Sequence, residues 1–230
     1  MPFSGFDDRV AEARRAIAEA VRRGGHGQEV RLIAVTKTHG PDAVMAAWNA
    51  GIRDVGENKV QEALDKQPHV TGDATAMRWH LIGHLQRNKV KFLDRFALFH
   101  ALDSERLAGA VHAFGVTRGR AVEALVEVNF SLEETKGGFA PSEVERLAAG
   151  WRALEGVRVT GVMTMAPFDA DEATLRRVFG GARAARDALV RAGHPARELS
   201  MGMSGDYEIA VEEGATMVRL GTVLFGARAT

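Results

Sequence analysis

The chain has 230 residues, 46% of them apolar, and its 30 basic side chains balance its 30 acidic ones, so the formal net charge at pH 7 is zero. This length suits one large domain or two small ones, with enough apolar residues for a proper core. The charge balance argues against binding driven mainly by nucleic-acid phosphates or anionic lipids, and the lack of cysteine excludes disulfides, iron–sulfur clusters, thiol catalysis and cysteine-bound zinc.

The N-terminal segment predicts neither a signal peptide nor a membrane anchor. Residues 1–23 carry charged side chains throughout and lack the apolar stretch on which both depend. Elsewhere no apolar run approaches the roughly 20 residues that span a bilayer. We therefore expect a cytoplasmic protein that binds no membrane, and we expect its first element to be a helix over about residues 7–23.

Short apolar segments rich in β-branched residues alternate along the chain with segments of helical period. In chain order these strand candidates are Val30–Thr36, the residues around Val55, Trp79–Gly83, Ala97–Asp103, Ala121–Phe130, Val157–Met165, Arg197–Gly202 and Thr216–Gly221. Continuous apolar runs without strict alternation are typical of strands buried on both faces of a parallel sheet.

The helical segments between these strands carry recognisable end signals. Pro41 stands where a first-turn proline belongs, and Gly51 closes the same helix. Asp103 or Ser104 is expected to cap the helix that follows the fourth strand.

The second half of the chain shows the same kind of signal. Ser142, with Glu145 three residues later, forms a capping-box pattern ahead of VERLAAGWRAL. A longer amphipathic helix is predicted over residues 171–192, and another is expected to begin near Asp206.

About eight strands, each followed by a helix or a turn and with no linker between them, predict an α/β fold with a parallel sheet. Eight such units fit a (β/α)8 barrel of the TIM type, which typically takes about 250 residues. The alternative is an open doubly wound sheet, but no G-x-G-x-x-G turn follows the first strand. We expect a single barrel domain over about residues 30–226, preceded by the extra helix.

The active site of such a barrel lies at the carboxyl ends of the strands, and Lys37 directly follows the first one. Partial desolvation there would lower the pKa of the amine and expose the lone pair that attacks a carbonyl to form a Schiff base. A lysine on the rim that only reaches into solvent is the alternative at this point.

Two turns after the last two strands have the composition of a phosphate site. SMGMSGDYE offers backbone N–H groups and the hydroxyls of Ser200 and Ser204, and VRLGTVLFG adds a second small turn at Gly221 and Thr222. An ordinary strand-to-helix turn, in which Ser204 is only a helix cap, is equally compatible with the first of these segments.

Further polar residues lie at or near strand ends. Arg219 lies within the last strand, where a buried guanidinium would need a partner, although an outward arginine paired with a helix carboxylate is the alternative. Asn58 follows the second strand and is placed to hydrogen-bond a ligand oxygen. His80 and His84 are four residues apart, but the strand end and Gly turn between them do not give helical geometry, so we predict no metal site. The basic stretch at residues 86–92 is interpreted as a solvated helix face.

An amine, a phosphate cup and a buried cation at one barrel rim together predict a phosphorylated aldehyde ligand. Pyridoxal 5'-phosphate (PLP) fits that description, with its aldehyde at Lys37, its phosphate at the two turns and its ring nitrogen at Arg219. A Schiff-base aldolase acting on sugar phosphates is another class of protein with the same amine.

Six ordered motifs, from about residue 30 to residue 226, closely resemble the pyridoxal phosphate homeostasis proteins, which in turn resemble the N-terminal barrel of alanine racemase. The motifs are AVTKT, GENKVQEAL, WHLIGHLQRNK, GVMTMAP, LSMGMSGDYEIA and MVRLGTVLFG. The resemblance implies a type III PLP fold with the cofactor on a covalent aldimine to Lys37, and with Arg219 facing the pyridine nitrogen. It also implies cofactor-binding positions at Asn58, Met163, Ser200, Ser204, Gly205, Gly221 and Thr222.

The chemistry of an arginine at the ring nitrogen favours a cofactor carrier over an enzyme. A guanidinium cannot accept the ring proton, so the cofactor would be a weak electron sink. Racemases of the resembled fold use a second base and a second domain. The only tyrosine in this sequence, Tyr207, is expected in the helix after the seventh strand, where capping or packing explains it equally well. We predict a monomer without dedicated catalysis that buffers, protects or delivers PLP, with PLP-dependent apo-enzymes as partners and no nucleic acid or membrane. A PLP-dependent amino-acid racemase or decarboxylase is the alternative.

Overall fold

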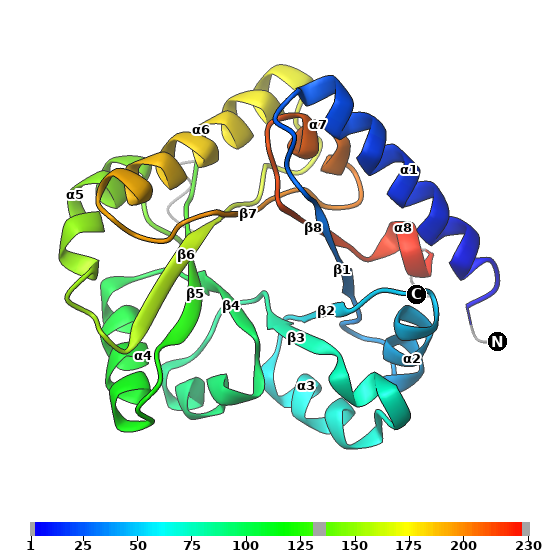
Figure 1. Ribbon diagram of the computed structural model, residues 1–230, viewed down its shortest axis with the longest axis horizontal. Helices are drawn as coiled ribbons and strands as arrows, with labels where there is room; N and C mark the ends of the chain where they lie inside the picture. Colours follow the sequence, from blue (N-terminus) through cyan, green and yellow to red (C-terminus); the bar gives the residue numbers. More distant parts are fainter. Residues whose placement is uncertain (1–2, 131–136, 227–230) are drawn as a thin grey trace.

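The computed structural model describes residues 3–130 and 137–226, and it is a closed barrel of parallel strands with the helices outside. Each strand pairs with the next along the chain, and β8 pairs with β1 to close the ring (Figure 1). This confirms the predicted (β/α)8 barrel, and the open doubly wound sheet is wrong.

Each strand overlaps one of the predicted apolar segments. The strands are β1 Arg31–Val35, β2 Asp54–Glu57, β3 Arg78–Leu81, β4 Leu98–Leu102, β5 Val122–Glu127, β6 Val157–Met163, β7 Glu198–Ser200 and β8 Met217–Leu220. Most end earlier than their apolar segments, because the chain leaves the ladder there to form the loops at the mouth of the barrel.

Helices of unequal length connect the strands. They are α1 Phe6–Gly24, α2 Pro41–Asn49, α3 Val60–Lys66, α4 Glu105–Thr117, α5 Pro141–Trp151, α6 Glu172–Arg191, α7 Tyr207–Glu212 and α8 Thr222–Phe225, with 3-10 helices η1 Gln67–His69, η2 Gly72–Ala76 and η3 Arg87–Arg95. The basic stretch at residues 86–92 lies largely on η3, where Val90 is buried while Arg87 and Lys91 are exposed.

The predicted helix ends are confirmed except at α5. Ser104 caps α4 by accepting the N–H of Leu107, and Asp171 caps α6 by accepting the N–H of Thr174. The capping box predicted from Ser142 and Glu145 is wrong. Pro141 occupies the first helical position, so Ala140 is the N-cap residue; the carboxylate of Glu143 accepts the N–H of Ala140, and the alanine side chain has no oxygen to return the bond.

The N-terminal helix α1 packs on the barrel beside α7 and α8 (Figure 1). It buries one apolar stripe that contains Val10 and Ile17, and Arg23 near its end pairs with Glu208 and Glu212 on α7. The predicted helix over about residues 7–23 is therefore confirmed, and it joins the start of the chain to the segment after β7.

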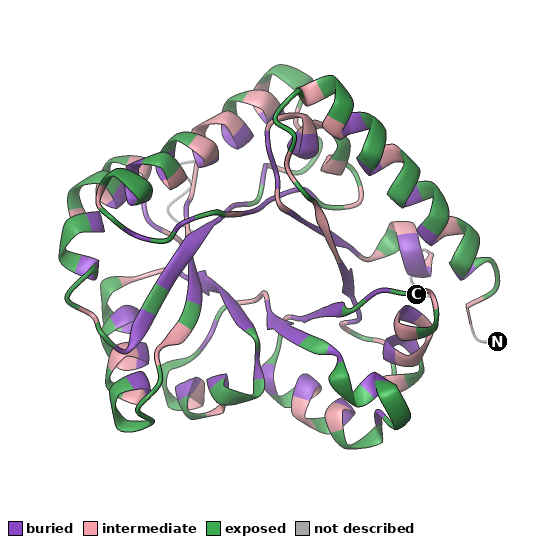
Figure 2. Ribbon diagram, in the orientation of Figure 1, coloured by how far each residue is buried: buried purple, intermediate pink, exposed green. Residues whose placement is uncertain are grey.

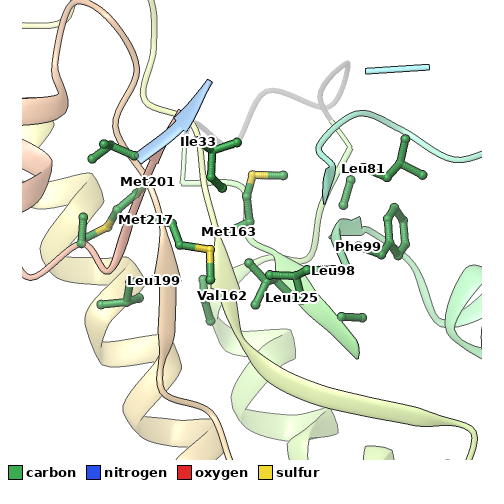
Figure 3. Close-up of a cluster of buried hydrophobic side chains, with 14 of the residues drawn as sticks. Ile33, Leu81, Leu98, Phe99, Leu125, Val162, Met163, Leu199, Met201 and Met217 are labelled. Carbon is green, nitrogen blue, oxygen red and sulfur yellow. The ribbon is translucent and has the colours of Figure 1, made fainter. Parts of the chain in front are cut away.

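The core of the barrel is formed largely by apolar side chains of the strands. Figure 2 shows the strands largely buried and the helices striped with buried and exposed residues. Figure 3 shows apolar side chains from several strands packed together, among them Ile33 of β1, Met163 of β6 and Met217 of β8. Among the described residues no helix is both long and apolar enough to cross a membrane.

Candidate functional site

Three predicted site residues lie at the carboxyl end of the barrel. Val35 of β1 pairs in register with Gly56 of β2, so Lys37 and Asn58, each two residues further on, lie at the same level beyond the strand ends. Both side chains are half-buried. Met163 ends β6 and is buried at 1% exposure. The structure thus brings all three to one mouth.

A buried ion pair supports the segment just before Lys37. Lys66 of α3 donates from Nζ to the carbonyl of Thr36 and to Glu57 Oε1, both at 2.7 Å. The hydroxyl of Thr36 donates to the same Glu57 oxygen at 2.6 Å. Burial raises the pKa of Glu57, and the Lys66 ammonium opposes that rise. The strand end that carries Lys37 is therefore held by charge as well as by the barrel ladder.

The residue after Lys37 is held by the same network. The N–H of Thr38 donates to the carboxylate of Glu62, which also accepts from Lys66 Nζ at 2.8 Å. Thr38 has a left-handed backbone, with φ of 69°, which a threonine rarely adopts without such support. Both neighbours of Lys37 are thus fixed, and its amine extends from a rigid segment.

The two predicted phosphate turns lie against each other. The hydroxyl oxygen of Ser204, in the turn after β7, accepts the N–H of Val223 in α8 at 3.2 Å. A Cβ added to Gly205 would meet no atom within 4 Å, so open space borders this turn. Thr222 is exposed and Gly221 half-buried at the start of α8. The alternative role of Ser204, as cap of α7, is wrong, because Asp206 occupies the cap position.

Ser200 lies deeper than the two turns. It ends β7, is fully buried, and its hydroxyl contacts Arg219 Nη1 at 2.7 Å and His100 Nδ1 at 2.9 Å. Its contact with a phosphate stays a prediction, while the structure shows it as a partner of Arg219.

Arg219 is buried inside the barrel at 4% exposure. Its Nη1 donates to the carbonyl and hydroxyl oxygens of Ser200, both at 2.7 Å, and its Nη2 donates to the carbonyl of Thr164 at 3.0 Å. The alternative, an outward arginine paired with a helix carboxylate, is therefore wrong. Burial lowers the pKa of Arg219 to about 10, and Asp206 and Glu127 act in the opposite direction, so the side chain stays charged at neutral pH.

Comparison with known proteins identifies the family of this chain. The family model described as alanine racemase, N-terminal domain, matches residues 11–229. The pyridoxal phosphate homeostasis protein of Aquifex aeolicus is 38% identical over 224 residues, covering 96% of this chain and 97% of that protein. Its counterpart in Escherichia coli is 37% identical and covers 95% of both. The chain belongs to the pyridoxal phosphate homeostasis protein family.

Solved structures support the same assignment. PipY of Synechococcus elongatus, in a structure with PLP bound, is 34% identical with a TM-score of 0.84, covering 96% of this chain and 100% of that one. An alanine racemase of Clostridium difficile has a TM-score of 0.71 at 14% identity, covers 94% of this chain and 56% of that one, and is similar in fold alone.

In this family member the two histidines of WHLIGH serve different partners. His80 is buried and contacts Asp54 at 2.8 Å, whereas His84 is exposed at the mouth and contacts Asp103 at 2.6 Å. Among the described residues no three His, Cys, Asp or Glu side chains are grouped so that they could hold a metal ion.

Two further carboxylates lie at the mouth that the sequence patterns do not identify as site residues. Glu127 ends β5, and burial together with the charge of nearby Asp103 raises its pKa to about 7. Asp103 follows β4 and is predicted from the sequence only as a helix cap. The position of both residues at strand ends, the criterion that selects Lys37, is the signal that could have found them.

We predict that replacing Lys66 with Met lowers the free energy of unfolding by about 3–5 kcal/mol at neutral pH, because it leaves Glu57 buried without its cation. The matched control is Lys59→Met at the N-cap of the same helix, where the side chain is exposed and a change within about 0.5 kcal/mol is expected. Urea unfolding measures both. Equal losses in the two variants would contradict a structural role for the buried pair.

Glu127 gives a pH-dependent prediction. Its folded-state pKa of about 7 lies above the ordinary 4.5, so its contribution to stability is complete below about pH 4.5 and is lost as the pH rises through 7. Glu127→Gln stays neutral, so its free energy of unfolding should fall less between about pH 5 and pH 8 than that of the wild type. The expected difference is about 2 kcal/mol, allowing for partial solvent screening.

The control for this measurement is Glu123→Gln, which changes an exposed carboxylate at the other end of β5. Its pH profile should match the wild type. A Glu127→Gln profile parallel to the wild type would show that this carboxyl titrates alike in the folded and unfolded chains.

Proposed function

We propose that this chain binds PLP and acts in the homeostasis of that cofactor, holding it as a Schiff base on Lys37 and buffering or delivering it. One observation carries the proposal. A lysine on a fixed strand end, two joined turns and a buried guanidinium lie at the same end of one barrel. The family names and the PLP bound to PipY support it.

The residues at the mouth fit the three parts of this cofactor. Lys37 offers an amine for the aldehyde. Ser204 and the backbone of the α8 turn would hold the phosphate, since their mutual hydrogen bond places two polar turns together and Gly205 leaves space beside them. Arg219 would face the pyridine ring, with Asn58 and Met163 along its border. When bound, PLP supplies an aldehyde carbon for amine condensation and a ring that withdraws electrons.

The charge of Arg219 supports a carrier over an enzyme. Because this group stays protonated at neutral pH and already donates to Ser200 and Thr164, it cannot take a proton from the ring nitrogen. An unprotonated ring withdraws electrons weakly, which disfavours chemistry at an amino-acid α-carbon. We propose a cytoplasmic monomer that passes PLP to apo-enzymes, with no dedicated catalytic residue.

One observation favours a second function, a PLP-dependent amino-acid racemase or decarboxylase. Glu127, with a pKa of about 7, shares the mouth with Lys37 and would be able to give or take a proton near neutral pH. Steady turnover of an amino acid by the PLP-loaded protein, lost in Glu127→Gln, would favour this enzyme over the carrier. No turnover with any amino acid would favour the carrier.

The Schiff base is tested by reduction with borohydride followed by peptide mapping. The PLP-loaded protein should be yellow, should lose its visible band on reduction, and should carry the label on Lys37. Lys37→Ala should lose the band while retaining weak PLP binding through the phosphate turns, measured by equilibrium dialysis.

Lys59→Ala is the control, because Lys59 lies at the same end of the barrel, two residues beyond β2. It should keep both the band and the label. A label on another lysine, or an unlabelled protein, would overturn the assignment of Lys37. A colourless protein in which borohydride instead traps a sugar phosphate would point to the aldolase class.

A further inference from the structure

Four buried side chains connect Arg219 to the opposite end of the barrel. The contacts are Arg219 Nη1 to Ser200 Oγ at 2.7 Å, Ser200 Oγ to His100 Nδ1 at 2.9 Å, His100 Nε2 to His80 Nδ1 at 2.9 Å, and His80 Nε2 to Asp54 Oδ1 at 2.8 Å. All five residues are at most 4% exposed.

This chain of hydrogen bonds crosses the barrel interior. His100 lies on β4 and Ser200 on β7, and two other strands separate these along the ring. Asp54 is the first residue of β2, at the amino end of the barrel, where it also binds the exposed Arg78 through two hydrogen bonds. The chain therefore extends from Arg219 near the mouth to the far end of the strands.

The charges at its two ends determine which atom donates at each contact. Burial would raise the pKa of Asp54, but hydrogen bonds from His80 and Arg78 outweigh it and lower that pKa to about 2. Asp54 is thus an acceptor, and His80 must donate to it from Nε2. Burial lowers the pKa of both histidines, and the charge of Arg219 lowers that of His100 further, so both rings are neutral.

A neutral imidazole ring has one nitrogen that donates and one that accepts, so the role of one nitrogen fixes the role of the other. Because His80 donates from Nε2, its Nδ1 accepts from Nε2 of His100. Nδ1 of His100 in turn accepts the hydroxyl proton of Ser200. Ser200 Oγ, having donated its only proton, accepts from Arg219. Every bond thus points from the cation to the carboxylate.

We propose that Asp54, His80, His100 and Ser200 are positioning residues for Arg219, which fix its guanidinium toward the ring side of the cofactor site. The proposal rests on the proposed PLP site for its functional consequence, though not for the chain itself. The hydroxyl proton of Ser200 would not be available to the phosphate of PLP, because Ser200 donates it to His100. The phosphate would then depend on Ser204 and the two turns.

The hydrogen-bond direction is tested without cofactor by nitrogen-15 NMR of the histidine rings. At neutral pH, His80 and His100 should both carry the proton on Nε2, with an unprotonated Nδ1. The exposed ring of His69 supplies the reference signal of a solvated histidine. A proton on Nδ1 of His100, or a charged ring at either position, would overturn the proposal.

The positioning role is tested by His100→Asn in the PLP-loaded protein. Its visible spectrum should shift, and its dissociation constant for PLP should rise roughly five- to tenfold, as expected for loss of one ordinary hydrogen bond, here the bond between Ser200 and His100. Ser200→Ala should do the same, because it removes the hydroxyl that accepts from Arg219 Nη1, while the carbonyl of residue 200 remains as an acceptor.

The matched control is His194→Asn. His194 is also buried and uses one ring nitrogen, Nε2, to contact the carbonyl of Ala148 at 2.7 Å, away from the chain of five residues. Its spectrum and affinity should match the wild type. Identical behaviour of the His100 and His194 variants would overturn the positioning role. A wild-type protein that binds no PLP would instead refute the proposed function. The NMR result would still show whether the hydrogen bonds between Arg219 and Asp54 have the proposed direction.

Discussion

The buried positive charge of Arg219 is the constraint on which the candidate site depends. A guanidinium taken out of water is costly unless its N–H groups find acceptors. Here the acceptors are Ser200 and the carbonyl of Thr164, which lie at the ends of adjacent strands. Ser200 in turn needs an acceptor for its own proton, and that requirement continues through two histidines to Asp54. One charge near the mouth thereby accounts for the four buried polar residues of this chain of hydrogen bonds.

A second buried charge network acts on the other side of the mouth. Glu57, Glu62 and Lys66 hold the backbone on both sides of Lys37 and share no residue with the chain that ends at Arg219. The amine and the guanidinium are thus fixed by independent sets of interactions. This separation means that a change in one network need not displace the other group.

Local features of the sequence could be predicted, because they depend on neighbouring residues. Apolar runs gave the strands, and the spacing of apolar positions gave α1 and α6. Lys37 and the two turns follow from the rule that barrel sites lie at strand ends. The capping box predicted from Ser142 does not form, because Pro141 takes the first helical position and leaves Ser142 inside the helix. The hydrogen bond between His80 and His100 could not be predicted. Which side chains come together inside a barrel depends on strand register and tilt, and not on the spacing of residues in the sequence.

The closure of the ring between β1 and β8 has a consequence for how the protein is made. Lys37 follows the first strand, while Ser204, Arg219 and Thr222 come from the last two barrel units. A chain still emerging from the ribosome therefore carries the amine long before the other groups exist, and α1 lacks its packing partners α7 and α8 during the same period. A ligand that needs both Lys37 and the residues of the last two barrel units can bind only after synthesis is nearly complete. Folding of the early units therefore precedes ligand binding.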